Sequence, residues 1–223
     1  MPRGETAFTK RLDRGAPDGS MFVLTGPSGA GKTTLARLLE REGWERLDGD
    51  ALAKTLYVPG SPLLRAMAKK FGKDILRQDG SLDSIRLGEI VFPSLTRRKA
   101  LNRLVYPRFL RILGARLGAA RKRKLRLVAD VAVYFDLGAP ALGLPVVLVQ
   151  APLRTRVQRL KAAGLSPARA RARAAALGFG ARERALADLV LDGTKAPGTL
   201  LRELKLGLAE AAARPDAGMP RNP

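Results

Sequence analysis

The most informative segment of this chain is Gly26-Pro27-Ser28-Gly29-Ala30-Gly31-Lys32-Thr33. It fits the pattern G-x-x-x-x-G-K-[S/T], the Walker A motif, in which a glycine-rich loop surrounds nucleotide phosphates. The apolar run Met21–Thr25 precedes it and predicts a short buried strand. Leucines at helical spacing follow it and predict a helix over 32–40. A strand, a phosphate-binding loop and a helix in this order are the context in which the motif is meaningful.

Each residue type in the motif has a physical role. Glycines permit backbone conformations that a Cβ would block, so successive N–H groups turn toward phosphate oxygens. The start of the helix adds the positive end of its dipole. The lysine is expected to reach the β- and γ-phosphates and the threonine hydroxyl to bind Mg²⁺, so the predicted ligands are ATP and Mg²⁺. The residues predicted to bind the nucleotide are Gly26, Ser28, Gly29, Ala30, Gly31, Lys32, Thr33 and Thr34.

Apolar runs alternate with helical patterns along the rest of the chain, which predicts an α/β fold: a P-loop NTPase-type parallel sheet flanked by helices. Residues 51–124 lack strand signals and predict an inserted helical substrate domain. Within it, Ser94 is expected to cap a long helix that Pro107 kinks or breaks. Further strands are predicted at 44–47, 125–129, 146–149 and 189–191.

The predicted organisation places the nucleotide-binding core on both sides of the helical insertion. Arginine-rich helices late in the chain are expected to form a helical lid, because arginines on a mobile segment can stabilise phosphate charge. A solvated helix face accounts equally well for most of these arginines. The predicted parts are a flexible leader 1–20, a core 21–50 and 125–206 with the lid at about 153–184, the helical domain 51–124, and the end of the last helix with a disordered tail at 207–223.

Three carboxylates follow predicted strands and are candidates for chemistry at the sheet edge. Asp48 and Asp50 come after the second strand, where an aspartate could orient an acceptor hydroxyl, take its proton or hold Mg²⁺. Capping of a helix near residue 51 is the structural alternative for Asp50. Asp130 ends the third strand, which is a Walker B pattern, so Thr33 and Asp130 are the predicted Mg²⁺ ligands.

Composition excludes several chemistries. The 223 residues contain no cysteine, which excludes disulfides, thiolate metal sites and a cysteine nucleophile. They contain no histidine either, so a general base must be a carboxylate, a lysine or a tyrosine. No apolar run approaches the ~18 residues of a membrane span, and the N-terminus lacks a signal-peptide pattern. We therefore expect a soluble cytoplasmic protein with no membrane segment.

The net charge is +21, from 41 lysines and arginines against 20 acidic residues. Such a field attracts polyanions, including nucleic acid and phosphorylated metabolites. A codon bias toward arginine would produce the same excess without a functional reason. Nucleic acid is therefore expected only as a nonspecific partner.

With these residues in hand, the chain resembles the dephospho-CoA kinase family from about 21 to 206. The likeness includes the Walker A segment, Asp48-Gly49-Asp50, Val58-Pro59-Gly60-Ser61-Pro62, Asp79-Gly80-Ser81-Leu82-Asp83 and Ala187-Asp188-Leu189-Val190-Leu191-Asp192. The resemblance implies a P-loop kinase core, a helical CoA-binding domain, a lid, and dephospho-CoA as the small-molecule acceptor. It also implies that Asp50 takes the proton of the ribose 3′-hydroxyl and that Arg173 is the lid arginine. Together with Lys32, these are the predicted catalytic residues.

Four positions depart from the family pattern. Tyr106 stands in Val-Tyr-Pro where the family has Leu-His-Pro, and Ala132 stands where the family has proline. Leu177 replaces a glutamine after the lid arginine, and Gly193 replaces an asparagine after the last strand. These changes fall where the acceptor or the adenine would be held, whereas the phosphoryl-transfer residues are present.

Two other functions are compatible with the residues. A P-loop kinase could act on another small anionic acceptor, although a helical region of this size is large for a compact one. A nucleotide-binding regulatory or RNA-associated protein without turnover would explain the positive charge. That second function would not need Lys32, Thr33 and Asp50, which are all present.

Overall fold

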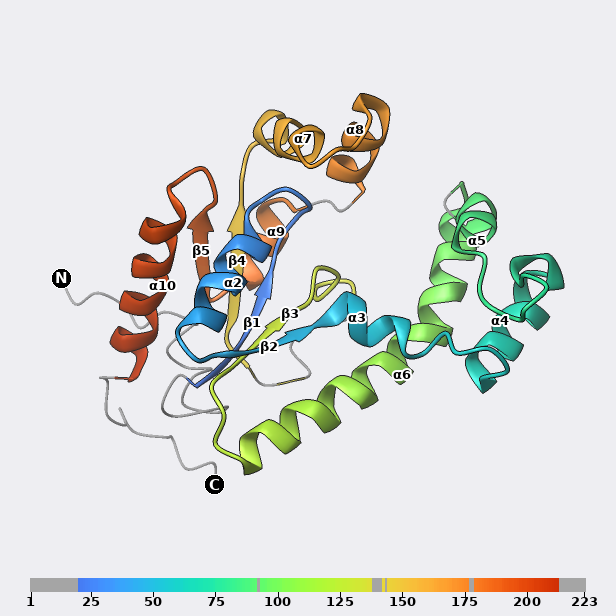
Figure 1. Cartoon of the computed structure of the whole chain (residues 1–223), viewed down its shortest axis with the longest axis horizontal. Helices are drawn as coiled ribbons and strands as arrows, with labels where there is room; N and C mark the ends of the chain where they lie inside the picture. Colours follow the sequence, from blue (N-terminus) through green and yellow to red (C-terminus); the bar gives the residue numbers. More distant parts are fainter. Residues whose placement is uncertain (1–19, 92, 138–141, 143, 177–178, 213–223) are drawn as a thin grey trace, which may run out of the picture. The chain divides into compact units, whose positions relative to one another are not determined.

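The computed structural model describes residues 20–91, 93–137, 142, 144–176 and 179–212. These residues divide into two compact units (Figure 1). One unit contains the chain up to Asp48 together with the chain from Ala120 onward, and the other is Gly49–Ala119. Among the described helices, none combines the length and the apolar character that a bilayer crossing requires.

The first unit is built on a five-stranded sheet in which every neighbouring pair is parallel, in the order β2-β3-β1-β4-β5 (Figure 1). The predicted strands all form, with ends shifted by no more than one or two residues. This confirms the predicted parallel sheet. The strands are β1 Met21–Thr25, β2 Glu45–Asp48, β3 Leu127–Asp130, β4 Val146–Gln150 and β5 Leu189–Asp192.

The central strands are apolar because they are covered on both faces. Phe22 on β1 and Val147 on β4 are fully buried, and Leu35 and Leu39 of the helix after the loop pack into the same core. Phe22 also meets Trp44 edge to face, with ring centroids 5.2 Å apart. Burial of each such side chain contributes roughly 1.5–3 kcal/mol, so this core fixes the strands that carry the loop.

Helices cover this sheet and extend from its edge. Helix α10 packs against α2 and β5, α9 contacts β4, and α7 packs against α8 (Figure 1). The short helix α9 was not predicted, because six residues give too brief a periodic pattern to detect. The helices of this unit are α2 Lys32–Arg41, α7 Leu153–Ala162, α8 Pro167–Ala175, α9 Ala181–Leu186 and α10 Pro197–Ala212.

The second unit is helical. Its elements are α3 Gly49–Lys54, α4 Pro62–Phe71, the 3₁₀ turn η1 Lys73–Ile75, α5 Ser84–Val91 and most of α6 Leu95–Lys122. Ser61 caps α4, and its hydroxyl accepts a hydrogen bond from the Leu64 N–H at 3.2 Å. Ser94 caps α6 as predicted, accepting from the Arg97 N–H at 3.3 Å.

Helix α6 continues through Pro107, so of the two expected effects of this proline, a kink or a break, the break does not occur. A proline inside a helix removes one backbone hydrogen bond and crowds the preceding turn. Here Val105, Phe109 and Leu113 recur every four residues and are buried along one face. Packing of that face outweighs the local cost of the proline.

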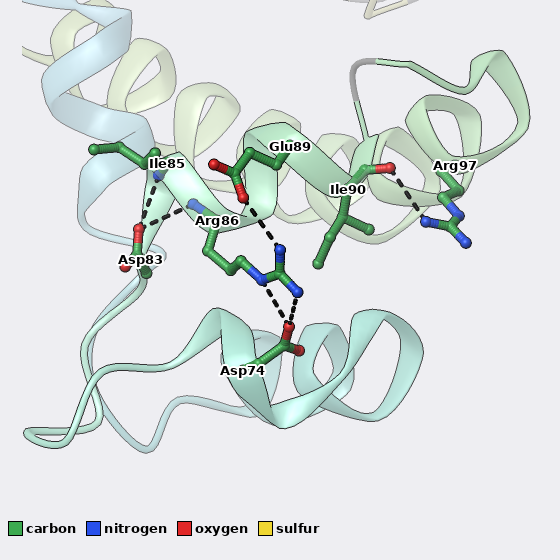
Figure 2. A network of polar contacts seen from close by, with 7 residues as sticks. All are labelled: Asp74, Asp83, Ile85, Arg86, Glu89, Ile90 and Arg97. Carbon is green, nitrogen blue, oxygen red and sulfur yellow. Dashed lines mark hydrogen bonds and ion pairs between the residues drawn. The ribbon is translucent and has the colours of Figure 1, made fainter.

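An ion-pair network joins η1 to α5 within the helical unit (Figure 2). The Arg86 Nε donates to Asp74 at 2.7 Å, and its Nη1 donates to Glu89 at 3.1 Å. These partners, Asp74 first, raise the pKa of Arg86. Asp83 accepts from the N–H groups of Ile85 and Arg86 and so caps the start of α5 (Figure 2). Exposed pairs of this kind contribute little energy individually, so the network chiefly fixes the geometry of the turn.

Candidate active site

The loop between β1 and α2 can be made only with glycine at two positions. Gly26 has φ 143°, and a Cβ there would lie 2.1 Å from the Val149 carbonyl oxygen on β4. Gly29 has φ 80°, and a Cβ there would lie 2.7 Å from the Arg156 carbonyl oxygen on α7. Both backbones adopt conformations that L side chains rarely allow. The motif glycines therefore let the loop lie directly against β4 and α7.

Lys32 is the first residue of α2 and folds back over the loop. Its Nζ donates to the Gly26 carbonyl oxygen at 2.6 Å and to the Pro27 carbonyl oxygen at 3.2 Å. The N-cap of α2 is Gly31, which offers no side-chain cap, and the first turn has no acidic residue. The first N–H groups of a helix have no partner within the helix. A phosphate group is the ligand that suits them and the neighbouring ammonium.

Thr33 and Thr34 follow Lys32 in the first turn of α2, and both are exposed. Both hydroxyls lie at the start of the helix that follows the predicted phosphate-binding loop. A glycine cradle, a lysine at its mouth and an exposed hydroxyl together fit ATP with Mg²⁺. Among the described residues, no three acidic side chains gather in a way that could hold a metal ion.

Asp130 ends β3 as predicted, and its carboxylate is ion-paired with Arg46 on β2. The Arg46 Nη2 lies 2.6 Å from Asp130 Oδ2 and 3.4 Å from Asp48 Oδ2. The Asp130 side chain is only 10% exposed and Arg46 17%, whereas Asp48 is 42% exposed. Burial opposes the charge of Arg46, but the hydrogen bond and charge of Asp130 outweigh it and raise the pKa of Arg46. A cation therefore balances the charge of this carboxylate.

Sequence reasoning missed Arg46. Asp48 and Asp130 lie opposite each other in the register of β2 and β3, so both side chains reach the same edge. Arg46 precedes Asp48 by two residues, which puts it on the same face of the strand. A charged residue two positions before a strand-end aspartate is the signal that could have indicated the pair.

Asp50 lies in the first turn of α3, two residues after the end of β2, and is exposed. It does not precede its helix, because α3 begins at Gly49. Asp50 therefore lies inside the first turn of α3, one residue after the helix begins. Asp50 belongs to the helical unit, whereas the Walker A loop belongs to the sheet unit.

Arg173 lies near the end of α8 with an exposed side chain. Ala170 and Ala174 of the same helix are buried. Arg156 of α7 donates from Nε to the Ala151 carbonyl at 3.0 Å and from Nη1 to the Ala174 carbonyl, which ties α7 to α8. Burial lowers the pKa of Arg156. Arg156 thus holds the helix that presents Arg173.

Arg159, one turn further along α7, contacts the Walker A loop. Its Nη1 donates to the Ala30 carbonyl at 3.2 Å and to the Gly29 carbonyl at 3.3 Å. Its Nη2 donates to the Gly193 carbonyl, after β5, at 2.8 Å. Spacing alone did not distinguish this arginine from its neighbours, because its partners are all backbone carbonyls from other parts of the chain.

The four residues that depart from the family pattern differ in where they lie and in how far they are buried. Tyr106 is partly buried on α6, and Ala132 is partly buried in the turn after β3. Gly193 is buried beside the Walker A loop. Leu177, four residues after the predicted lid arginine Arg173, lies outside the described residues.

A parallel sheet with a Walker A loop after its central strand defines the class of P-loop nucleotide-binding proteins. The family model for dephospho-CoA kinase matches residues 20–197, and the chain belongs to that family. A Streptomyces avermitilis relative described as dephospho-CoA kinase is 38% identical over 173 residues, which cover 76% of this chain and 82% of the relative. A relative from Anaeromyxobacter dehalogenans with the same description is 34% identical over 209 residues, which cover 90% of this chain and 96% of the relative.

Solved structures agree with the fold. The Thermus thermophilus protein TT1252 superposes with a TM-score of 0.69 at 33% identity and covers 85% of this chain and 96% of its own. A dephospho-CoA kinase from Campylobacter jejuni superposes with a TM-score of 0.59 at 21% identity. The match covers 86% of this chain and 97% of the Campylobacter chain. At that identity the second structure supports the fold alone.

Proposed function

We propose that this protein transfers the γ-phosphoryl group of ATP to the 3′-hydroxyl of dephospho-CoA, giving coenzyme A and ADP. The observation that carries the proposal is a complete Walker A loop, with Lys32 at its mouth, in a chain that belongs to the dephospho-CoA kinase family. The cytoplasm is the proposed compartment, since ATP is the phosphoryl donor. Any binding of nucleic acid is proposed to be nonspecific and to depend on the +21 charge.

The nucleotide is proposed to bind through the Walker A loop. The N–H groups of the loop and of the first turn of α2 hold the β- and γ-phosphates, and Lys32 neutralises their charge. Lys32 now donates to carbonyls of Gly26 and Pro27, so it is already positioned at the loop. The proposed ligand residues are those predicted from the motif: Gly26, Ser28, Gly29, Ala30, Gly31, Lys32, Thr33 and Thr34.

Thr33 and Asp130 are the protein groups proposed to face Mg²⁺. When bound, the ion neutralises charge on the phosphates and helps to orient them. The exposed Thr33 hydroxyl offers a direct ligand. Asp130 Oδ2 is engaged by Arg46, so Oδ1 is the oxygen that we assign to the metal side.

Asp50 is proposed as the general base and Arg173 as the arginine that stabilises charge in the transition state. Transfer to a hydroxyl forms a P–O bond to the acceptor oxygen and breaks the bond between the γ-phosphorus and the bridging oxygen of ADP. The acceptor proton passes to the Asp50 carboxylate, since the chain has no histidine to take it. The helical unit 49–119 is proposed to bind the acceptor, and α7 to α9 to act as the lid.

The test measures ADP release from ATP and Mg²⁺, with and without dephospho-CoA, for the wild type and for Asp50→Asn. We expect release that depends on dephospho-CoA and falls by about 10²–10⁴-fold in Asp50→Asn, the usual contribution of a general base. Glu210→Gln, at an exposed position of α10, removes one carboxylate as a matched control and should match the wild type. ATP binding without acceptor-dependent release would reject dephospho-CoA as the substrate.

A further inference from the structure

The backbone at Gly193 lies against the Walker A loop with no room for a side chain. A Cβ at Gly193 would lie 2.0 Å from the Ala30 carbonyl oxygen and 3.0 Å from the Gln150 carbonyl oxygen. Both contacts are with backbone, which cannot move aside as the end of a flexible side chain would. The Gly193 N–H donates to the same Gln150 oxygen at 2.6 Å, which holds this residue beside the end of β4. The asparagine expected here from the family pattern cannot occupy this backbone.

Arg159 bridges the two segments that Gly193 brings together. Its guanidinium donates to the Gly193 carbonyl on one side and to the Gly29 and Ala30 carbonyls of the Walker A loop on the other. A planar guanidinium presents several N–H donors in fixed directions, so one side chain can satisfy carbonyls from two segments. A side chain at residue 193 would have to displace the Ala30 carbonyl, which is one of the acceptors of Arg159.

The bridge also sets the direction of loop N–H groups. In a planar trans peptide, the C=O of one residue and the N–H of the next point in opposite directions. Arg159 holds the Ala30 carbonyl on its own side, so the Gly31 N–H is directed to the opposite side of the loop. The orientation of that donor decides whether it can meet a phosphate oxygen.

We propose that Gly193 and Arg159 act together as a positioning pair that fixes the Walker A loop for ATP. Gly193 brings its carbonyl close to the loop, and Arg159 joins that carbonyl to those of Gly29 and Ala30. The consequence is a reversal of the usual expectation: restoring asparagine at residue 193 weakens ATP binding instead of improving it. This inference rests on the proposed use of ATP by the same loop.

The test measures the dissociation constant of Mg²⁺-ATP by calorimetry without acceptor, for Gly193→Ala, Gly193→Asn, Arg159→Gln and Arg159→Lys. Loss of hydrogen bonds from a charged donor is expected to weaken binding about tenfold in Arg159→Gln. Arg159→Lys keeps the positive charge but loses the planar guanidinium with its several donors. It should therefore bind ATP more tightly than Arg159→Gln and more weakly than the wild type. Gly193→Ala and Gly193→Asn should weaken binding at least as much as Arg159→Gln.

Matched controls separate this effect from general disruption. Gly198→Asn changes a glycine on α10 where a Cβ would meet nothing within 4 Å, and Arg202→Gln removes an exposed arginine from the same helix. Both should bind ATP like the wild type. The double variant Gly193→Ala with Arg159→Gln should lose no more than the larger single loss, because paired residues are not additive.

Further readouts distinguish positioning from loss of structure. KM for ATP should rise while KM for dephospho-CoA stays near the wild-type value. Wild-type or tighter ATP binding by Gly193→Asn would overturn the inference, as would an unchanged dissociation constant in Arg159→Gln. Should Gly193→Asn fail to fold by circular dichroism, Gly193→Ala and Arg159→Gln decide the question. A wild type that binds ATP but does not phosphorylate dephospho-CoA would reject the proposed acceptor and leave this test intact.

Discussion

The two sides of β1 carry opposite charge at the carboxyl edge of the sheet. Toward β2 and β3 lie the carboxylates of Asp48 and Asp130, joined by Arg46. Toward β4 and β5 lie the guanidinium groups of Arg156 and Arg159, whose partners are backbone carbonyls. A phosphoryl transfer needs cations and N–H donors around the nucleotide phosphates, and carboxylates for the metal and the acceptor proton. The parallel sheet separates these two environments by placing β1 between them.

The difference teaches how each side is held in place. The side toward β4 and β5 is named the nucleotide side. Its arginines, Arg156 and Arg159, donate to peptide oxygens, so their positions depend on the path of the backbone. On the other side, the side chain of Arg46 pairs with the carboxylates of both Asp48 and Asp130. Variants of the cationic residues on the nucleotide side should therefore change ATP binding and turnover, whereas variants at Arg46 should change stability.

Among the variants that compare the two sides of β1, the largest effect is expected on the nucleotide side, for Lys32→Met. Removal of a group that stabilises transition-state charge lowers the rate by roughly 10²–10³-fold. Methionine keeps an unbranched stem of similar length without the ammonium group, so the fold should persist. Steady-state kinetics of ADP release and a thermal melt of the free protein measure the two quantities. Arg37→Met, at an exposed position of the same helix, is the control and should keep the wild-type rate. Equal losses in both variants would mean that general charge, and not Lys32, serves the reaction.

A smaller effect is expected on the carboxylate side, for Arg46→Met. The variant leaves Asp130, which is 10% exposed, without its partner at 2.6 Å. Loss of a hydrogen bond between charged groups costs about 2 kcal/mol of the free energy of unfolding. Asp130→Asn should cost less, because the amide oxygen still accepts a hydrogen bond. Urea unfolding of both single variants and of the double variant measures the coupling, and simple additivity of the two losses would contradict a direct pair.

The smallest effect concerns Asp192, a carboxylate on the nucleotide side. Its pKa is lowered first by the hydrogen bond from the Thr194 N–H, at 2.9 Å, then by the Thr194 hydroxyl, and further by the charges of Lys195 and Arg159. A carboxylate with a lowered pKa in the folded state stabilises the fold above the unfolded pKa of about 3.9. That stabilisation is lost as pH falls through the lower folded value. Asp192→Asn should therefore show a flatter loss of stability below about pH 4 than the wild type. Identical acid unfolding curves would show that Asp192 makes no such contribution.

Much of the fold could be predicted from the sequence because its signals are local. The apolar strand Met21–Thr25, the motif glycines and the helix after them depend on neighbouring residues, and the structure has them where expected. The unbroken course of α6 through Pro107 was not predictable, since the packing of its buried face decides it. The site follows the same division. Lys32 and Thr33 were predicted from the spacing of the motif. Arg46 and Arg159 were not predicted, since they have partners 84 and up to 130 residues away in the chain.

The sequence by itself determined the strand, the phosphate-binding loop and the lysine and threonine that follow it. Those features follow from backbone freedom at glycine and from helical spacing, which act over a few residues. Only the tertiary structure decided that Arg46 engages Asp130, that Arg159 holds the loop carbonyls, and that Gly193 has no space for a side chain. These depend on which strands become neighbours in the sheet, and that arrangement is set by burial of the whole apolar core.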